Sequence, residues 1–540
     1  MGILTEFNMK SILFDYKNTF FQSKKYWLIF LILILILGLS TCSQNNLAHP
    51  KMEIIAFILV AVLGIFSIVF YFLHDSDEEL YKVAFVIILI FGITTALIVP
   101  ICDISDESEH LTRAEITSQG VLIPHWTGED MGIDRLYNHT EGEALSTQIN
   151  EGAGYHSIMS MNFFVESSGQ TVFETSHDKD NINYSDSIMY SAFEQNPFYG
   201  YLPQAIGIFL AKIFDLNVIW ILWLARIGNV LFYASVVSIA IRKTPVLKIP
   251  LLAVACIPIT LYQASSASID SAIMGLGILS IAYFISMCKA KEKSLTNKNI
   301  AIFTIICLLL GLCKLPYLAF ILLLLFVPSR NFENDRKHNL LLLFIPIIIV
   351  LIIGLLLSRY STNALMHSWR SSQNLVNSTL QLNYQINHPK SILIFLYNIF
   401  FSDLPKMIMG VFSFFGGKQT YHYIDKYHFI TGVLLLYLGS TLLAYPRNVV
   451  FELKTKLGSA FVILLIYIAT CFIQLLTWAH IGQYNLGIST RYFIPLMALL
   501  PVVIWIKQIP FNKNSFDKYA MIFMIAFMAT LIISFATKYY

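Results

Sequence analysis

Charged residues are scarce in this chain of 540 residues. They occupy 13% of its positions, whereas soluble domains average about 25%. Hydrophobic residues reach 56% and recur in long runs from end to end. A run of about 18 apolar residues is long enough to cross roughly 30 Å of hydrocarbon as a helix. The scarcity of charge therefore excludes a string of soluble domains and favours one large membrane domain.

Other absences narrow the class further. The apolar runs, such as 27–39 and 340–357, do not alternate with polar residues, which argues against a membrane-spanning barrel. The seven cysteines show no metal-ligand spacing. No glycine-rich phosphate loop, nucleotide fold or nucleic-acid patch is visible, so an ATP-driven transporter and a nucleic-acid partner are not expected. The first apolar run begins near Trp27 and is long enough to stay in the membrane, unlike a cleavable signal peptide.

We predict an all-α polytopic membrane protein with about 13 transmembrane helices, within a range of about 11 to 14. The predicted spans are 27–43, 52–73, 83–101, 217–241, 249–264, 269–288, 299–313, 315–328, 339–357, 428–445, 457–478, 494–506 and 519–536. They divide the chain into a membrane segment (1–101), an acidic extracytoplasmic loop (102–200), a membrane core (201–357), a second extracytoplasmic segment (358–427) and a last membrane segment (428–540).

Lysine and arginine set the expected orientation, because short loops rich in these residues stay in the cytoplasm. They gather before the first span and in the loops at 242–248, 289–298, 330–337, 447–456 and 507–518. With thirteen spans, all these loops fall on one side, which places the N-terminus in the cytoplasm and the C-terminus outside. The loop 74–82 fits poorly, since it holds four acids and only Lys82.

The two long outer segments differ in character. Residues 102–200 contain seventeen Asp and Glu against Arg113, Arg135 and Lys179. Residues 358–427 include two apolar stretches, 391–401 and 404–416, which cannot both span under this topology. We predict that they lie on or re-enter the outer interface, where helices can hold a lipid-borne substrate at the headgroup level.

The stretch from Asp103 to Glu115 carries the strongest chemical signal, because it packs seven charged or imidazole side chains into thirteen positions just after a span. As a helix it would present Asp106, His110 and Arg113 on one face. A carboxylate can act as general base, and arginine binds phosphate through two hydrogen bonds. The alternative is a solvated helix start, since acidic residues favour helix N-termini anyway.

Three further residues could serve such a site. Arg491 and His480 fall in one outer loop, and Lys314 lies between two short apolar segments. A charge beside apolar sequence faces a cavity or the interface, because lipid excludes it. Contact with a donor phosphate and simple snorkelling to the interface both remain open for Arg491. Arg226 and Asp270 lie within or near spans, where an ion pair between them would fix helix packing.

Several motifs occur in an order that resembles the bacterial membrane family known as domain of unknown function 2142. The matching segments are Asp106-Glu107 with His110 and Arg113-Ala114, Leu202-Pro203-Gln204, Arg226 with Asn229, Ser266 with Asp270, Lys314 with Pro316-Tyr317, and Arg491-Tyr492-Phe493 with Pro495. Serine and threonine precede Arg491 where a smaller residue is expected. The resemblance covers about residues 100–500.

That family is similar in architecture to the GT-C glycosyltransferases. The resemblance implies a bacterial cytoplasmic-membrane enzyme that transfers a sugar from a polyprenyl-phosphate donor to a glycan or lipid acceptor on the outer face. It implies Asp106 as the base, with Glu107 and Asp103 as alternates. His110, Arg113, Lys314, Arg491 and His480 would bind substrate or phosphate. The acidic motif contains no Asp-x-Asp pair, so no cofactor is indicated, although a divalent metal would be compatible.

Three rival functions stay open. A transporter or flippase for a lipid-linked glycan would carry charged residues along a path through its spans. A polymerase or ligase of surface polysaccharide would use a pyrophosphate-linked donor on the same face. A membrane scaffold would use the acidic loop to bind a partner, but this leaves the ordered polar motifs unexplained.

Overall fold

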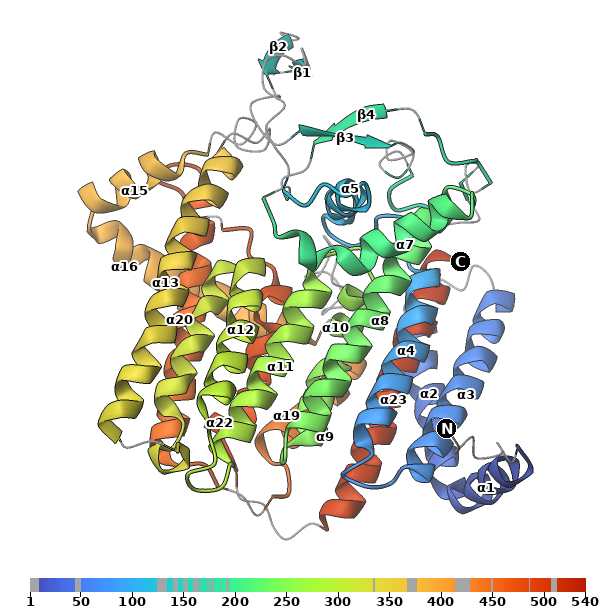
Figure 1. Cartoon of the computed structure of the whole chain (residues 1–540). Coiled ribbons are helices and arrows are strands. Elements are labelled where there is room, and N and C mark those ends of the chain that lie inside the picture. Colours follow the sequence, from blue (N-terminus) through green and yellow to red (C-terminus); the bar gives the residue numbers. More distant parts are fainter. Residues whose placement is uncertain are drawn as a thin grey trace, which may run out of the picture.

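The fold is taken from a computed structural model of the chain, drawn in Figure 1. The structure describes residues 9–43, 50–123, 134–138, 144–148, 154–158, 164, 167–171, 174–175, 179–184, 186–190, 193, 195–333, 336–366, 376–412, 428–447, 450–484, 486–506 and 512–540. Long helices run side by side through the bundle, and a smaller layer of helix, strand and loop covers its upper end in Figure 1.

The long helices carry most of the apolar sequence. They are α2 (Lys24–Cys42), α3 (Pro50–Leu73), α4 (Leu80–Ile98), α8 (Ile219–Lys243), α11 (Asp270–Cys288), α12 (Asn297–Cys313), α13 (Arg336–Met366), α19 (His428–Leu443), α20 (Leu453–Thr477) and α23 (Lys513–Tyr539). The shorter, more polar helix α1 (Met9–Gln22) precedes them.

Shorter elements connect and cover them. The helical ones are α5 (Glu107–Ser118), η2 (Phe198–Gly200), α7 (Leu202–Ile213), α9 (Lys248–Ala255), α10 (Pro258–Ala264), η3 (Leu315–Phe326), η4 (Ser329–Asn331), α15 (Ser378–Asn387), α16 (Lys390–Tyr397), η5 (Asn398–Asp403), α17 (Leu404–Val411), η6 (Thr490–Phe493), α21 (Ile494–Met497) and α22 (Leu500–Val503). Two antiparallel pairs are formed by β1 (Asp134–Asn138) with β2 (Ala144–Gln148), and by β3 (Gly154–Ile158) with β4 (Asp186–Tyr190).

The helical membrane bundle is confirmed, but the count of thirteen spans is not. Within the described residues, nine helices are long and apolar enough to cross a membrane. Proline accounts for part of the difference, since it removes a backbone donor and interrupts a helix. The predicted span 249–264 divides into α9 and α10 at Pro258, and 494–506 divides into short turns around Pro495 and Pro501. The segment 315–328 forms the 3₁₀ helix η3 rather than an α-helix.

The second outer segment also differs from its prediction. The stretches 391–401 and 404–416 form one helical run, Lys390–Val411, made of α16, the π-helical turn η5 and α17. By length and composition this run is among the nine that could cross a membrane. Residues 413–416 lie outside the described part of the chain. The interfacial placement of these helices stays a prediction.

The lysine- and arginine-rich loops meet at the end of the bundle opposite α5, at the bottom of Figure 1. The acidic loop 74–82 joins them there. Asp75 pairs with Lys518 at 3.0 Å, Asp77 pairs with Lys513 at 3.3 Å, and Lys248 donates to the Asp77 carbonyl. Two acids of this loop therefore pair with lysines at the start of α23, and Glu79 pairs with Lys82 of the loop itself.

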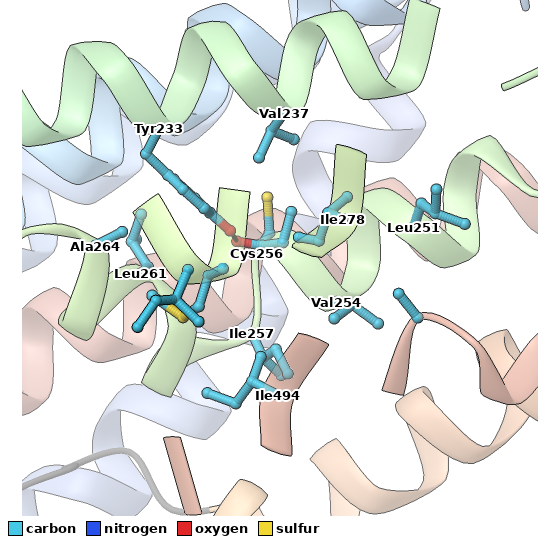
Figure 2. Close-up of a cluster of buried hydrophobic side chains, with 14 of the residues drawn as sticks. Tyr233, Val237, Leu251, Val254, Cys256, Ile257, Leu261, Ala264, Ile278 and Ile494 are labelled. Carbon is cyan, nitrogen blue, oxygen red and sulfur yellow. Dashed lines mark hydrogen bonds between the residues drawn. The ribbon is translucent and has the colours of Figure 1, made fainter. Parts of the chain in front are cut away.

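The interior of the bundle centres on α11 and α23. In the apolar stretches of these two helices, 83% and 89% of the residues are buried. Figure 2 shows the cluster where the break between α9 and α10 packs against α8, α11 and α21. Tyr233 donates to the Ala255 carbonyl at 2.9 Å, at the end of α9. A helix end leaves such carbonyls without an intrahelical partner, so this bond stabilises the break in a buried position.

Helices α7 and α8 approach each other through two glycines. A Cβ on Gly207 would lie 2.1 Å from the Leu224 carbonyl oxygen, and one on Gly228 would lie 2.2 Å from the Pro203 carbonyl oxygen. Both obstacles are backbone atoms, which cannot rotate away. Small residues that allow such close contact are typical of helix pairs in membranes.

Gly228→Ala is therefore expected to destabilise the protein by about 1 to 3 kcal/mol, because the added methyl overpacks two backbones. Thermal unfolding in detergent measures the loss. Gly432→Ala on α19 is the matched control, since nothing lies within 4 Å of its added Cβ. Equal melting temperatures for the two variants would contradict the close α7–α8 contact.

Candidate functional site

The acidic segment after α4 turns sharply at Asp106, the N-cap residue of α5. Its backbone adopts the left-handed conformation, with φ of 64°. Aspartate tolerates this region better than most residues, yet it still costs about 1 kcal/mol or more. His110 continues the turn by donating its backbone N–H to the Asp106 carbonyl at 3.0 Å. The strained turn holds α5 across the end of the bundle.

A buried ion pair between Arg226 and Glu107 anchors the start of α5. The guanidinium donates to both carboxylate oxygens, at 2.8 and 2.6 Å, and both side chains are completely buried. Arg226 also donates to carbonyls at the end of α4, those of Ala96, Val99 and Pro100, at 2.8 to 3.0 Å. Glu107 further accepts the Ala267 N–H at 2.9 Å. With both oxygens engaged, Glu107 has a structural role in this arrangement.

Asp103 is held by two tyrosines from distant parts of the chain. Tyr262 in α10 donates to one carboxylate oxygen at 2.8 Å, and Tyr539 at the end of α23 donates to the other at 3.0 Å. Two hydroxyl donors fix the orientation of the Asp103 carboxylate. The end of α23 therefore lies at the same end of the bundle as α5.

Arg491 in η6 lies between two carboxylates. Its Nη2 donates to Asp106 Oδ2 at 2.7 Å, and its Nη1 donates to the Ser105 carbonyl at 3.0 Å. Its Nε lies 3.4 Å from Asp270 Oδ2 without hydrogen-bond geometry, so both of those buried atoms lack a hydrogen-bond partner among the described residues. Asp106 is 29% exposed, whereas Arg491 is only 5% exposed. Within this ion pair, Asp106 is therefore the partner that solvent or a ligand can reach.

Lys314 lies between α12 and η3, outside the nine candidate spans. Its Nζ packs over the Tyr492 ring, 3.0 Å from the centroid, and the Arg491 guanidinium packs over the same ring. Lys314 forms no ion pair within the described part of the chain. Burial lowers the pKa of its ammonium to about 7, while Asp270 opposes this shift and Arg491 adds to it. The contacts of Lys314 among the described residues thus include an aromatic ring but no carboxylate within ion-pair distance.

These groups surround a cavity of about 720 Å³, a size typical of small-molecule sites. Its charged lining residues include Asp106, Lys314 and Arg491. Its lining also includes residues of α11, α12, α13 and α20. Apolar side chains in the lining include Ile269, Ile273, Leu312, Leu315, Pro316, Val376 and Ile473. Such a cavity suits a ligand with a charged head and a hydrocarbon tail.

Most of the predicted site residues meet at this cavity. Asp103, Asp106, Glu107, His110, Lys314 and Arg491 line it. His110 hydrogen-bonds the Tyr201 hydroxyl at 2.7 Å and stacks on Phe193, with ring centroids 4.1 Å apart. Asp106, Lys314 and Arg491, which lie far apart in the sequence, therefore gather at one place.

Two predicted residues do not join them. Arg113 is completely buried and donates to the Thr117 hydroxyl at 2.8 Å and to the Leu122 and Asn196 carbonyls at 3.0 and 3.2 Å. It is not among the lining residues, so the expected face of Asp106, His110 and Arg113 divides. Asp106 occupies the N-cap position of α5 in a left-handed turn, without a capping hydrogen bond from its side chain. Arg113 points towards the carbonyls of Leu122 and Asn196 instead of the cavity. His480 is exposed and lies outside the cavity lining.

Ion pairing also differs from expectation. Arg226 pairs with Glu107, and Asp270 faces Arg491 instead. The sequence analysis missed the polar side of α20, where Thr470, Gln474 and Thr477 line the cavity. Their spacing of i, i+4 and i+7 within an apolar helix was the available signal, because polar residues in a span usually face the bundle interior.

The family profile described as "Predicted membrane protein (DUF2142)" matches residues 89–500, which is well over half of the chain. The chain belongs to this family. The resemblance found in the ordered motifs is thus confirmed, and the match includes Asp103, Asp106, Lys314 and Arg491. No curated protein and no solved structure matches the chain. In this DUF2142 protein, Tyr539 approaches Asp103 from outside the matched region.

The described residues contain no group of three or more His, Cys, Asp and Glu side chains that could hold a metal ion. Three of the carboxylates at the cavity pair with arginines or tyrosines: Glu107 with Arg226, Asp106 with Arg491, and Asp103 with Tyr262 and Tyr539.

Glu107→Gln is expected to lower the stability by about 3 to 5 kcal/mol, because it leaves the buried Arg226 guanidinium without a counter-charge. Unfolding in detergent, followed by fluorescence, measures this loss. Asp106→Asn is the comparison, since Asp106 is partly exposed and Arg491 keeps Asp270. A Glu107→Gln protein as stable as wild type would refute the structural role of the Arg226–Glu107 pair.

Proposed function

We propose that this protein is a membrane glycosyltransferase of GT-C type. It transfers a sugar from a polyprenyl-phosphate donor to a glycan or lipid acceptor of the cell envelope, on the outer face of a bacterial cytoplasmic membrane. The observation that carries the proposal is that Asp106, Arg491 and Lys314 line one cavity together with several apolar side chains. The N-terminus is then cytoplasmic and the C-terminus extracytoplasmic.

The donor fits this cavity in one orientation. Its phosphate binds at Lys314 and Arg491, which pack against the same tyrosine ring. Its isoprenoid chain lies along apolar lining residues such as Val376, just before α15, and Ile473 in α20. Arginine is suited to phosphate because its planar group offers two parallel donors. The sugar then projects towards the carboxylates of the acidic segment.

Asp106 is the general base of the proposed reaction. It is the partly exposed carboxylate next to the phosphate-binding arginine, so it can take the proton of an acceptor hydroxyl as that oxygen attacks the sugar. Asp103 remains the alternate, fixed by Tyr262 and Tyr539. Glu107 is the weaker alternate because Arg226 occupies both of its oxygens.

The remaining predicted residues support the site from further out. His110 lines the cavity and contacts substrate in this proposal. Arg113 holds the loop after α5 through carbonyl contacts, and His480 could meet only the part of an acceptor that extends beyond the cavity. The charged lining residues gather at the end of the bundle near α5. This favours transfer over a flippase, which needs a path through the bilayer.

Asp106→Asn is expected to reduce sugar transfer by about 100- to 10,000-fold, the usual contribution of a general base. The assay uses purified protein in liposomes and isoprenyl monophosphates that carry radiolabelled glucose, galactose or mannose. Labelled product and released isoprenyl phosphate are separated by chromatography.

Glu174→Gln is the matched control, because Glu174 belongs to the same acidic loop, residues 102–200, but does not line the cavity. It should transfer as wild type does. Equal transfer by Asp106→Asn and wild type would remove Asp106 as the base, and movement of intact donor across the bilayer without transfer would favour the flippase.

The binding of a phosphodiester should weaken as the pH rises above 7. Burial lowers the pKa of Lys314 to about 7, so its positive charge is present below that pH and is lost above it. The affinity for the phosphodiester should therefore fall by up to about tenfold per pH unit. An isoprenyl methyl phosphodiester is the probe, since its single charge does not change in this range, and calorimetry from pH 6 to 8.5 measures it.

Lys314→Arg should flatten this profile, because arginine stays protonated. Asp270 and Arg491 are the charged groups nearest to Lys314, and the variant leaves both in place. A wild-type profile without slope, or one that Lys314→Arg shares, would show that Lys314 does not bind the phosphate.

A further inference from the structure

Two cations serve the cavity in different ways. Arg491 already has carboxylate partners, Asp106 at 2.7 Å and Asp270 at 3.4 Å. Lys314 has only the ring of Tyr492 and no ion pair within the described part of the chain. Arg491 is therefore already paired within the protein, whereas Lys314 has no carboxylate partner among the described residues. A ligand anion would give Lys314 its first ion pair.

A single-phosphate donor carries that charge. A sugar joined to an isoprenoid by one phosphodiester is a monoanion, which Lys314 alone balances. A pyrophosphate-linked donor begins with two negative charges and ends with three, whereas Lys314 is the cavity cation without a carboxylate partner among the described residues. Unpaired charge away from bulk water is strongly unfavourable. The charge on the cavity therefore favours a monophosphate donor.

Transfer then changes the charges in a defined way. The acceptor oxygen bonds to the anomeric carbon, and the bond from that carbon to the phosphate oxygen breaks. The electron pair stays on the phosphate, which becomes a dianion, and the acceptor proton goes to Asp106. Asp106 loses one negative charge as the phosphate gains one. The sum over Asp106, Arg491, Lys314 and the phosphate is unchanged.

We propose that Arg491 exchanges partners in this step, leaving Asp106 as it is protonated and binding the second charge of the departing phosphate. This rests on the proposed function. The exchange needs little movement, because Arg491 and Lys314 contact the same ring and Arg491 Nε makes no hydrogen bond among the described residues. Asp270 stays beside the guanidinium and anchors it throughout. Proton uptake and leaving-group binding are thereby coupled through one side chain.

Asp106→Asn reproduces the protonated state of Asp106 in the absence of any reaction, and binding can be measured without turnover. Farnesyl phosphate is the probe for the dianionic product, and farnesyl methyl phosphate is the monoanionic probe. Calorimetry in detergent at pH 7, where Lys314 still carries charge and a phosphate monoester is largely dianionic, should show that Asp106→Asn binds farnesyl phosphate at least about tenfold more tightly than wild type does. Its affinity for the methyl diester should change by less than about twofold. These fold-changes follow from freeing one cation near a dianion.

The gain must depend on Arg491. In an Arg491→Gln background, Asp106→Asn should no longer tighten the binding of farnesyl phosphate. If that background does not purify as folded protein, Arg491→Lys replaces it. There a smaller gain is expected, since the ammonium of lysine lacks the planar fork with which arginine binds phosphate through two parallel hydrogen bonds. Glu174→Gln should bind both probes as wild type does.

The outcomes separate the two proposals. Equal tightening of both probes, no tightening, or a gain that survives the loss of Arg491 would overturn the exchange while leaving the donor site intact. Failure of the wild-type protein to bind either probe would overturn the proposed function itself. Tightening confined to farnesyl phosphate and to proteins with Arg491 would support both.

Discussion

The buried ion pair of Arg226 and Glu107 is the contact on which the rest of the site depends. One guanidinium binds the first residue of α5 and three carbonyls at the end of α4, from a position inside α8. It therefore sets where the chain leaves the bundle and how it turns back across it. Asp103 and Asp106 lie within that turn, so their positions follow from a contact that neither of them makes.

A network of polar contacts from remote segments completes the arrangement. α10 and α23 bring tyrosines to Asp103, η6 brings Arg491 to Asp106, and the junction of α12 and η3 brings Lys314. Asp103, Asp106, Lys314 and Arg491 lie where helices break or end, and the polar lining residues of α20 reach the same cavity from within a continuous helix. Proline residues at these breaks explain why spans that look continuous in composition are interrupted. The breaks in the helices therefore make room for the polar cavity inside an apolar bundle.

The chemistry proposed for the cavity follows from how charge is distributed in it. Of the two cations, Arg491 is shared with carboxylates and Lys314 is not. A ligand phosphate can therefore pair with Lys314 first and with Arg491 when the phosphate gains its second charge. Apolar side chains in the same lining supply a place for a hydrocarbon chain. Head and tail of one lipid phosphate are thus accommodated by features that lie side by side.

The amino-acid sequence by itself determined that this is a helical membrane protein and that its polar motifs include Asp106, Lys314 and Arg491. Hydrophobic length and the exclusion of charge from lipid act locally, so they can be read along the chain. Pairing could not be read in this way: Arg226 with Glu107, Asp270 with Arg491, and Arg113 with loop carbonyls follow from how separate helices pack. The number of spans could not be predicted from the sequence either. Proline breaks and a 3₁₀ segment interrupt the apolar runs, and where they do so depends on how the surrounding helices pack. Only the tertiary structure decided which charges meet, because an ion pair in a low-dielectric interior forms wherever packing brings two groups within reach, whatever their separation along the chain.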